Sequence, residues 1–257
     1  MKKHRISTLV IMAAISITVA AQSESGLIAN IEAEKKISKK LSITTEAEMR
    51  SRNDFKTIDR WSLGLGANYR FNKWLKADAG YKLLYSHYRE DTEYYTSSAG
   101  NAKVKWRPSY WGLRHRFYTS LTGTHKFANG LKLSLRERWQ YTYRPEETPT
   151  RYKMKVGEDD MELDEDYVRD GKGKHVLRSR FQIEYDKKNA LFTPFASIEL
   201  YNSLGIEKTR YTLGTDIRLG KNQSLNVFYR FQDMRHSSDD DNDPDMHYLG
   251  IGYKIKF

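Results

Sequence analysis

The chain alternates between apolar and polar residues over most of its length. In segment 246–257 the apolar positions are Leu249, Ile251, Tyr253, Ile255 and Phe257, and those between them are Tyr248, Gly250, Gly252, Lys254 and Lys256. Because successive side chains of a β-strand point to opposite faces, this pattern predicts a strand with one apolar face. An unpaired apolar edge strand aggregates in water, so the pattern favours a barrel closed in a lipid bilayer.

The same alternation predicts about ten further strands. The clearest is a hairpin over 111–144, in which Asn129-Gly130 is a strong turn signal. The others are expected at 27–35, 41–50, 61–71, 75–85, 177–185, 192–200, 211–219 and 225–231. Short basic turns alternate with longer links near 53, 90–105, 145–173, 205 and 237–245. Bacterial outer-membrane barrels show this asymmetry, and their short turns are periplasmic.

The strand number follows from the alternation together with the parity of bacterial barrels. The alternation yields about eleven strands, whereas single-chain bacterial barrels have an even number. Either segment 94–106 supplies a further strand, or segment 27–35 lies outside the wall. We expect an all-β, transmembrane, antiparallel up-and-down barrel of about 12 strands, with 10 as the alternative.

The N-terminal residues have the pattern of a secretory signal peptide. Lys2, Lys3 and Arg5 precede an apolar stretch, and Ala20-Ala21 supplies small residues before a cleavage site at Gln22. A helical anchor is the alternative, although the stretch is short for a membrane span. We expect residues 1–21 to be the signal peptide and residues 22–257 to form the barrel. Sec-type export would then lead to the outer membrane of a Gram-negative bacterium.

Composition narrows the possible functions. The 257 residues carry a formal charge of +11, with 18 Tyr, 5 Trp and no Cys. The absence of cysteine excludes disulfides and thiolate metal sites, and the aromatic rings suit lipid–water interfaces. The basic residues are spread over alternate strand positions, which argues against nucleic acid as a partner. Neither metal-ligand spacing nor a phosphate-binding glycine loop occurs, so we expect no metal and no cofactor.

Several short blocks resemble an uncharacterised barrel family. The run Arg114-His115-Arg116-Phe117-Tyr118 and segment 135–140 look like the Arg-rich hairpin of domain of unknown function 2490. Later blocks of that family are similar to segments 177–181, 198–201 and 210–214, and an early block is similar to 46–50. The resemblance spans nearly the whole mature chain and implies an outer-membrane barrel in a Gram-negative envelope. It implies no activity, because the family has none assigned.

Charged residues at alternate strand positions are expected to line the lumen. On the lipid face each Lys or Arg would be unfavourable by roughly 2–4 kcal/mol near the midplane, so inward placement is nearly forced. The predicted lumen-lining residues are Glu46, Glu48, Arg50, Arg70, Lys76, Asp78, Lys82, Arg114, Arg116, Arg136, Arg138, Arg178, Arg180, Glu184, Glu199, Arg210, Asp216, Arg218 and Arg230.

Three functions are compatible with such a barrel. Surplus arginines could line a small porin-like channel for anionic solutes. Alternatively, arginines and carboxylates could pair in a closed structural barrel, whose acidic outer loops at 158–166 and 239–245 bind an envelope partner or, through cations, lipid head groups. A lipid hydrolase would use His236 as base and Ser238 as nucleophile. No orienting third group stands where such esterases have one, so we expect no enzyme.

The C-terminal residues predict an insertion signal. Tyr253, Ile255 and Phe257 should point towards lipid, and Phe257 resembles the terminal aromatic residue that barrel-insertion machinery reads. The expected partners are outer-membrane lipid and the insertion machinery during assembly, with small anionic solutes added if the barrel is a channel.

Overall fold

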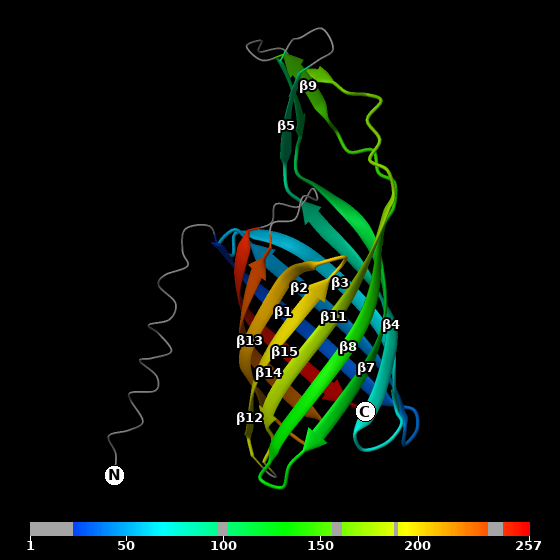
Figure 1. Cartoon of the computed structure of the whole chain (residues 1–257), viewed down its shortest axis with the longest axis vertical. Coiled ribbons are helices and arrows are strands. Elements are labelled where there is room, and N and C mark those ends of the chain that lie inside the picture. Colours follow the sequence, from blue (N-terminus) through cyan, green and yellow to red (C-terminus); the bar gives the residue numbers. More distant parts are fainter. Residues whose placement is uncertain (1–22, 97–101, 156–160, 188–189, 236–243) are drawn as a thin grey trace, which may run out of the picture.

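The fold consists of a barrel and a smaller sheet above it (Figure 1). The computed structural model describes residues 23–96, 102–155, 161–187, 190–235 and 244–257. Over these residues, no helix has the length and hydropathy to cross a membrane. The expected signal peptide, residues 1–21, lies outside the described residues and stays a prediction.

Within the described part of the chain, eleven strands close the barrel. They are β1 (Ser23–Lys36), β2 (Leu41–Arg52), β3 (Thr57–Arg70), β4 (Leu75–Tyr88), β7 (Tyr110–Lys126), β8 (Leu131–Arg144), β11 (Lys172–Tyr185), β12 (Phe192–Asn202), β13 (Ile206–Arg218), β14 (Gln223–Met234) and β15 (Asp245–Lys256). The all-β barrel predicted from the alternation is confirmed, and each expected strand is present.

The expectation of twelve strands, or ten, is corrected to eleven by the way in which the barrel closes. β1 and β15 pair in parallel, from Ser23 opposite Asp245 to Glu34 opposite Lys256. The other neighbouring pairs around the barrel are antiparallel. When strands alternate in direction, an odd number leaves the first and last running the same way. Their slanted parallel ladder still satisfies the backbone and leaves no open edge.

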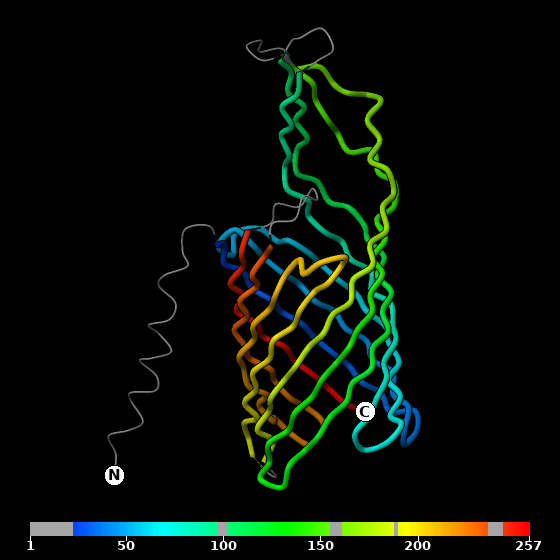
Figure 2. Tube along the Cα trace, viewed as in Figure 1, coloured from blue at the N-terminus to red at the C-terminus, as the bar shows by residue number. Residues whose placement is uncertain are grey.

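The two longest links between barrel strands contain a second sheet. It has the order β10-β9-β6-β5, formed by β5 (Asp91–Thr96), β6 (Ala102–Arg107), β9 (Tyr152–Lys155) and β10 (Glu162–Leu163). The trace in Figure 2 shows it rising beyond the barrel at the end opposite the short turns. Segment 94–106 therefore adds strands to this upper sheet and none to the barrel wall. Its strand β5 is almost entirely exposed, so it carries no inside–outside alternation.

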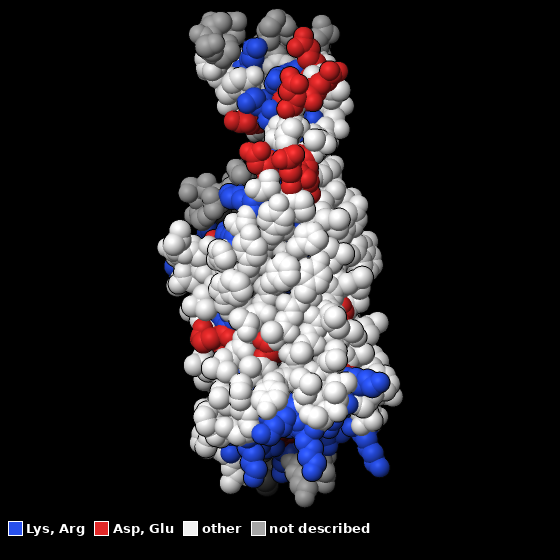
Figure 3. All heavy atoms as spheres, turned by 90° about the vertical axis from the view of Figure 1, so that its right-hand side faces the viewer, with Lys and Arg blue, Asp and Glu red and all other residues white. Residues whose placement is uncertain are grey.

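Apolar residues cover the outer wall of the barrel. Leu63, Leu135 and Leu249 are 63%, 53% and 54% exposed, and all three lie on the same face of the sheet. Figure 3 shows a largely uncharged band between a basic lower end and a charged upper part. An apolar band of this kind is what a barrel in hydrocarbon needs.

Glycines of the last strand make room for side chains inside the barrel. Ile28, Phe228, Met246 and Tyr248 form a small buried cluster against the wall. A Cβ atom at Gly250 would lie 2.0 Å from Cζ of Phe228, so only glycine allows this ring to pack there. The small residues of the terminal strand therefore face the lumen, as the alternation predicts.

Candidate functional site

The inner face of the barrel carries a network of arginines and carboxylates. The alternation of burial places even-numbered residues of most strands inward, and odd-numbered residues in β12. Every residue predicted to line the lumen lies on this face. Arg50, Glu199 and Arg210 are buried, whereas Arg70, Lys76 and Arg218 are exposed near the end with the short turns, and the others are intermediate.

Glu199 is the centre of one cluster. Its carboxylate accepts hydrogen bonds from Arg136 at 2.5 Å and from Arg178 at 2.9 Å. Tyr201, two residues along β12, donates its hydroxyl to the same carboxylate at 3.0 Å. The guanidinium groups of Arg178 and Arg210 also lie over the Tyr201 ring, at 4.5 and 4.6 Å from its centroid. Two arginines and a phenol thus satisfy one buried carboxylate, as a buried charge requires.

Glu48 is the centre of a second cluster on β2 and β3. Arg50 donates its Nε–H to the Glu48 carboxylate at 2.7 Å, and Arg60 reaches the same oxygen at 3.2 Å. Arg60 was missing from the predicted lumen residues because the expected strand began at Trp61. Its even number, shared with inward-facing Ser62, is the signal that could have found it.

Two further carboxylates have cationic partners on strands that are not their neighbours. Arg138 of β8 donates to Asp78 of β4 at 2.9 Å, across β7, and Ser120 of β7 donates to the same carboxylate. Lys82 of β4 reaches Glu46 of β2 at 2.6 Å, across β3. These contacts tie the wall together on its inner side.

A second group of lumen arginines has no carboxylate partner among the described residues. Their hydrogen bonds go to neutral groups: Arg116 donates to Thr142 at 3.0 Å, Arg210 to Gln232 at 2.7 Å and Arg230 to Thr212 at 3.1 Å. The members of this group are Arg114, Arg116, Arg180, Arg210 and Arg230. The described lumen therefore holds more positive than negative charge.

Two of these arginines line one cavity. It has a volume of about 210 Å³ and lies between β11, β12, β13 and β14. Its wall holds the guanidinium groups of Arg180 and Arg230, with carboxylates of Glu199 and Asp216 and aromatic rings. Amides and hydroxyls supply further hydrogen-bonding groups, from Gln182, Ser197, Thr212 and Asn226. Glu199 is already bonded to Arg136 and Arg178, and Asp216 accepts a hydrogen bond from Asn226. The cations and neutral donors of this wall can therefore still take up a small anion.

The described residues do not test the lipid-hydrolase hypothesis, and they contain no cluster of metal ligands. His236 and Ser238 lie in segment 236–243, outside the described residues, as does most of the acidic loop that follows them. No group of three or more His, Cys, Asp or Glu side chains in the described part of the chain could hold a metal ion.

The residues of the expected insertion signal lie on the outer wall at the lower rim. Phe257 is 66% exposed, and its backbone N–H donates to the backbone carbonyl of Glu34 at 2.8 Å. Tyr253 and Ile255 are intermediate in exposure on the same face of β15. Their reading by an insertion machinery stays a prediction.

The closed sheet, its apolar band and its charged lumen define a membrane β-barrel. The chain belongs to the family described as protein of unknown function DUF2490, which matches residues 27–243. Among solved structures, it is similar to the translocator domain of the autotransporter NalP from Neisseria meningitidis, with a TM-score of 0.52 and 10% identity over 79% of this chain and 72% of that chain. The β-domain of the Bordetella autotransporter BrkA matches with a TM-score of 0.46 and 11% identity, over 83% of this chain and 78% of that chain. A search of curated proteins finds no match.

Proposed function

We propose that this protein is a narrow, anion-selective barrel of the Gram-negative outer membrane, without catalytic activity. Sec-type export would bring the protein to this membrane. The observation that carries the proposal is the group of lumen arginines that have no carboxylate partner within the described part of the chain. Two of them, Arg180 and Arg230, line the same cavity. The likeness in fold to an outer-membrane translocator barrel supports the proposed location.

The unbalanced charge is the physical reason for anion binding. Leaving a buried charge without its partner is unfavourable by about 3–5 kcal/mol, so an anion from solution is a favourable counter-charge for these arginines. Rings of Arg and Lys in a pore favour anions over cations for the same reason. Cationic side chains continue towards the short-turn end, where Lys76 and Arg218 are exposed.

The side chains buried inside the barrel imply a small conductance. Leu84, Tyr201 and Tyr248 are only 2%, 4% and 5% exposed. Barrels of sixteen to eighteen strands leave a wide aqueous channel, whereas smaller barrels are largely filled by side chains. The same burial favours a second candidate function, in which the barrel stays closed and anchors the upper sheet at the cell surface.

Planar-bilayer recording separates the two functions. In a KCl gradient, the folded barrel should give a small conductance whose reversal potential has the sign for chloride. The double variant R180Q/R230Q should move this potential towards zero, whereas K221Q, which removes a charge from a short turn, should leave it unchanged. Cation selectivity, or an unchanged potential in the double variant, would contradict the proposal. A folded barrel without conductance would favour the closed anchor.

A further inference from the structure

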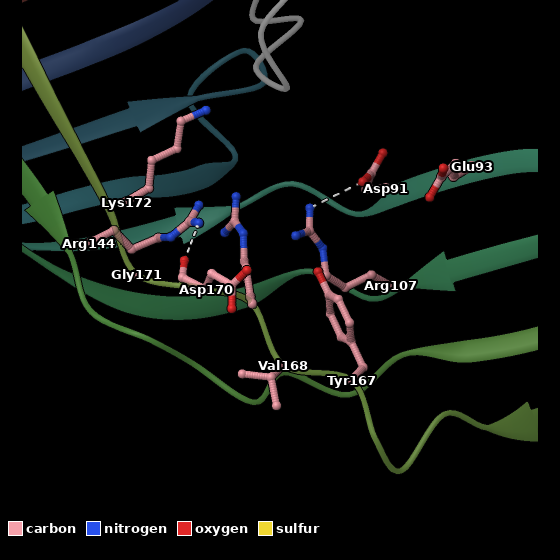
Figure 4. Close-up of a pocket in the computed structure, with 10 residues that line it drawn as sticks. Asp91, Glu93, Arg107, Arg144, Tyr167, Val168, Asp170, Gly171 and Lys172 are labelled. Atoms are coloured by element: carbon pink, nitrogen blue, oxygen red, sulfur yellow. Dashed lines mark hydrogen bonds and ion pairs between the residues drawn. The ribbon is translucent and has the colours of Figure 1, made fainter.

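A second pocket lies outside the lumen network, where the barrel meets the upper sheet (Figure 4). Its volume is about 360 Å³, within the range of roughly 300–1,000 Å³ typical of small-molecule sites. The walls come from the ends of β8 and β11, from β5 and β6, and from the segment that returns to β11. No residue of this pocket takes part in the ion pairs around Glu48 or Glu199.

Four cationic side chains from different elements line this pocket. Arg144 of β8 and Lys172 of β11 are direct cross-strand partners. Arg107 ends β6, and Arg169 belongs to the returning segment. In Figure 4 the side chain of Arg144 extends from the left of the view to the carbonyl of Asp170, and that of Arg107 rises on the right. Cations that converge from separate elements form a site for an anionic group.

Other contacts hold the guanidinium groups of Arg144 and Arg169 in place without neutralising them, whereas Arg107 forms an ion pair with Asp91. Arg144 donates to the backbone carbonyl of Asp170 at 2.9 Å. Arg169 donates to the hydroxyl of Tyr110 at 2.6 Å and lies 4.5 Å from the centroid of the Tyr88 ring. The Nε atoms of Arg107 and Arg144 are buried without a hydrogen-bond partner among the described residues. Fixed guanidinium groups of this kind bind a tetrahedral oxyanion with little loss of side-chain entropy.

Carboxylates lie beyond the arginines, on β5. Asp91 is 3.4 Å from Arg107, and the side chains of Asp91 and Glu93 are 64% and 63% exposed. Three carboxylates, including that of Asp170, oppose the four cations, so the pocket has a small positive excess. This excess can compensate a single phosphate but not a chain of several phosphates, so a single phosphate with hydroxyl groups beside it is the better match. Carboxylate oxygens accept hydrogen bonds from such hydroxyls.

We infer that this pocket binds a phosphorylated sugar. The phosphate monoester would lie against Arg107, Arg144 and Arg169, and the sugar hydroxyls would donate to Asp91 and Glu93. This ligand could be a free sugar phosphate or the phosphorylated sugar of a surface glycolipid. The two sources offer the same chemistry, and the pocket lies just above the apolar band where both would reach it.

Calorimetry in lipid nanodiscs without lipopolysaccharide tests this inference. Glucose 6-phosphate should bind the full-length barrel, and glucose and inorganic phosphate should each bind at least tenfold more weakly. Titration in the R180Q/R230Q background removes the cavity in the lumen as a second anion site. In that background R107Q/R144Q should lower the affinity for glucose 6-phosphate at least tenfold. K103Q, which removes a cation from β6 outside the pocket, should have no effect.

The outcomes separate this site from the proposed channel. Absence of glucose 6-phosphate binding, or equal binding by R107Q/R144Q with an intact heat-modifiable barrel, would overturn the inference whatever the lumen conducts. Loss of conductance with binding retained would instead count against the channel alone. If added lipopolysaccharide with phosphorylated core sugars displaces glucose 6-phosphate, the glycolipid is the ligand. If it does not, the free sugar phosphate is.

Discussion

Arginines in two regions of the lumen have different partners. Around Glu199, two guanidinium groups converge on a single buried carboxylate. In the neighbouring cavity, Arg180 and Arg230 donate to neutral groups or to none, and no carboxylate of the described residues pairs with them. The first region is a structural crosslink between strands β8, β11 and β12. The second holds charge that an external anion can neutralise.

The difference shows that an arginine-rich lumen has two separable roles. An arginine within hydrogen-bond distance of a carboxylate has a structural role, because removing either partner leaves a buried charge. An arginine held only by hydroxyls or amides keeps its charge available. The two regions should therefore respond in opposite ways to substitution: the first through stability, the second through selectivity.

The largest expected effect is on the Glu199 cluster. Glu199→Gln leaves Arg136 and Arg178 without their carboxylate, and should lower the free energy of unfolding by about 3–5 kcal/mol. Urea unfolding in lipid vesicles measures this. Glu32→Gln is the matched control, since Glu32 pairs with the partly exposed Lys254. That control should change stability by about 1 kcal/mol or less. Equal effects of the two variants would show that Glu199 has no special structural role.

A smaller effect is expected at the wall of the cavity. Gly250→Ala forces Phe228 away from β15, because the added Cβ would overlap the ring. Overpacking of this kind lowers stability by about 1–3 kcal/mol, and the displaced ring should also narrow the cavity and reduce conductance. At Gly123 a Cβ atom meets nothing within 4 Å, so Gly123→Ala serves as the control. If the two variants unfold at the same urea concentration, the packing described for Phe228 is wrong.

The smallest effect concerns a carboxylate outside the membrane. Burial alone would raise the pKa of Asp164, but hydrogen bonds from Lys153 and Arg151 hold this pKa below its ordinary value. A carboxyl group whose pKa is lowered by folding adds stability above its unfolded pKa of about 3.9, and this stability is lost as pH falls through the folded pKa.

Hydrogen-exchange protection factors at Glu162 and Leu163, which form β10, measure this loss. They should fall as pH drops below about 4. The loss of protection should correspond to less than about 1 kcal/mol, because the partner Lys153 is 42% exposed and water screens the pair. Asp164→Asn should remove the pH dependence. A protection that rises on acidification would contradict the assigned sign.

Much of the barrel could be predicted from the sequence, because the alternation of apolar and polar residues is enough to locate the wall strands. Each wall strand has one face in lipid and one in the lumen, so the inward residues of a strand follow from parity once that strand is placed. Arg60 was missed only because the expected strand began at Trp61, whereas β3 begins at Thr57. The upper sheet could not be predicted in this way, since β5 is exposed on both faces.

The strand number and the charge pairing depend on three-dimensional closure. The parallel pairing of β1 with β15 involves residues more than two hundred positions apart, and local patterns do not specify it. The partners of Glu199 and Asp78 include residues two strands away, which only the register and tilt of the closed sheet bring together. Alternation therefore predicts which arginines face inward, but not which of them lack a carboxylate.

Locating an anion directly would test the central claim. Crystals of the barrel soaked in bromide should show anomalous density in the cavity between Arg180 and Arg230, and none within the cluster of Glu199, Arg136 and Arg178. Bromide bound equally at both places, or absent from the cavity, would contradict the division of the lumen into neutralised and available arginines.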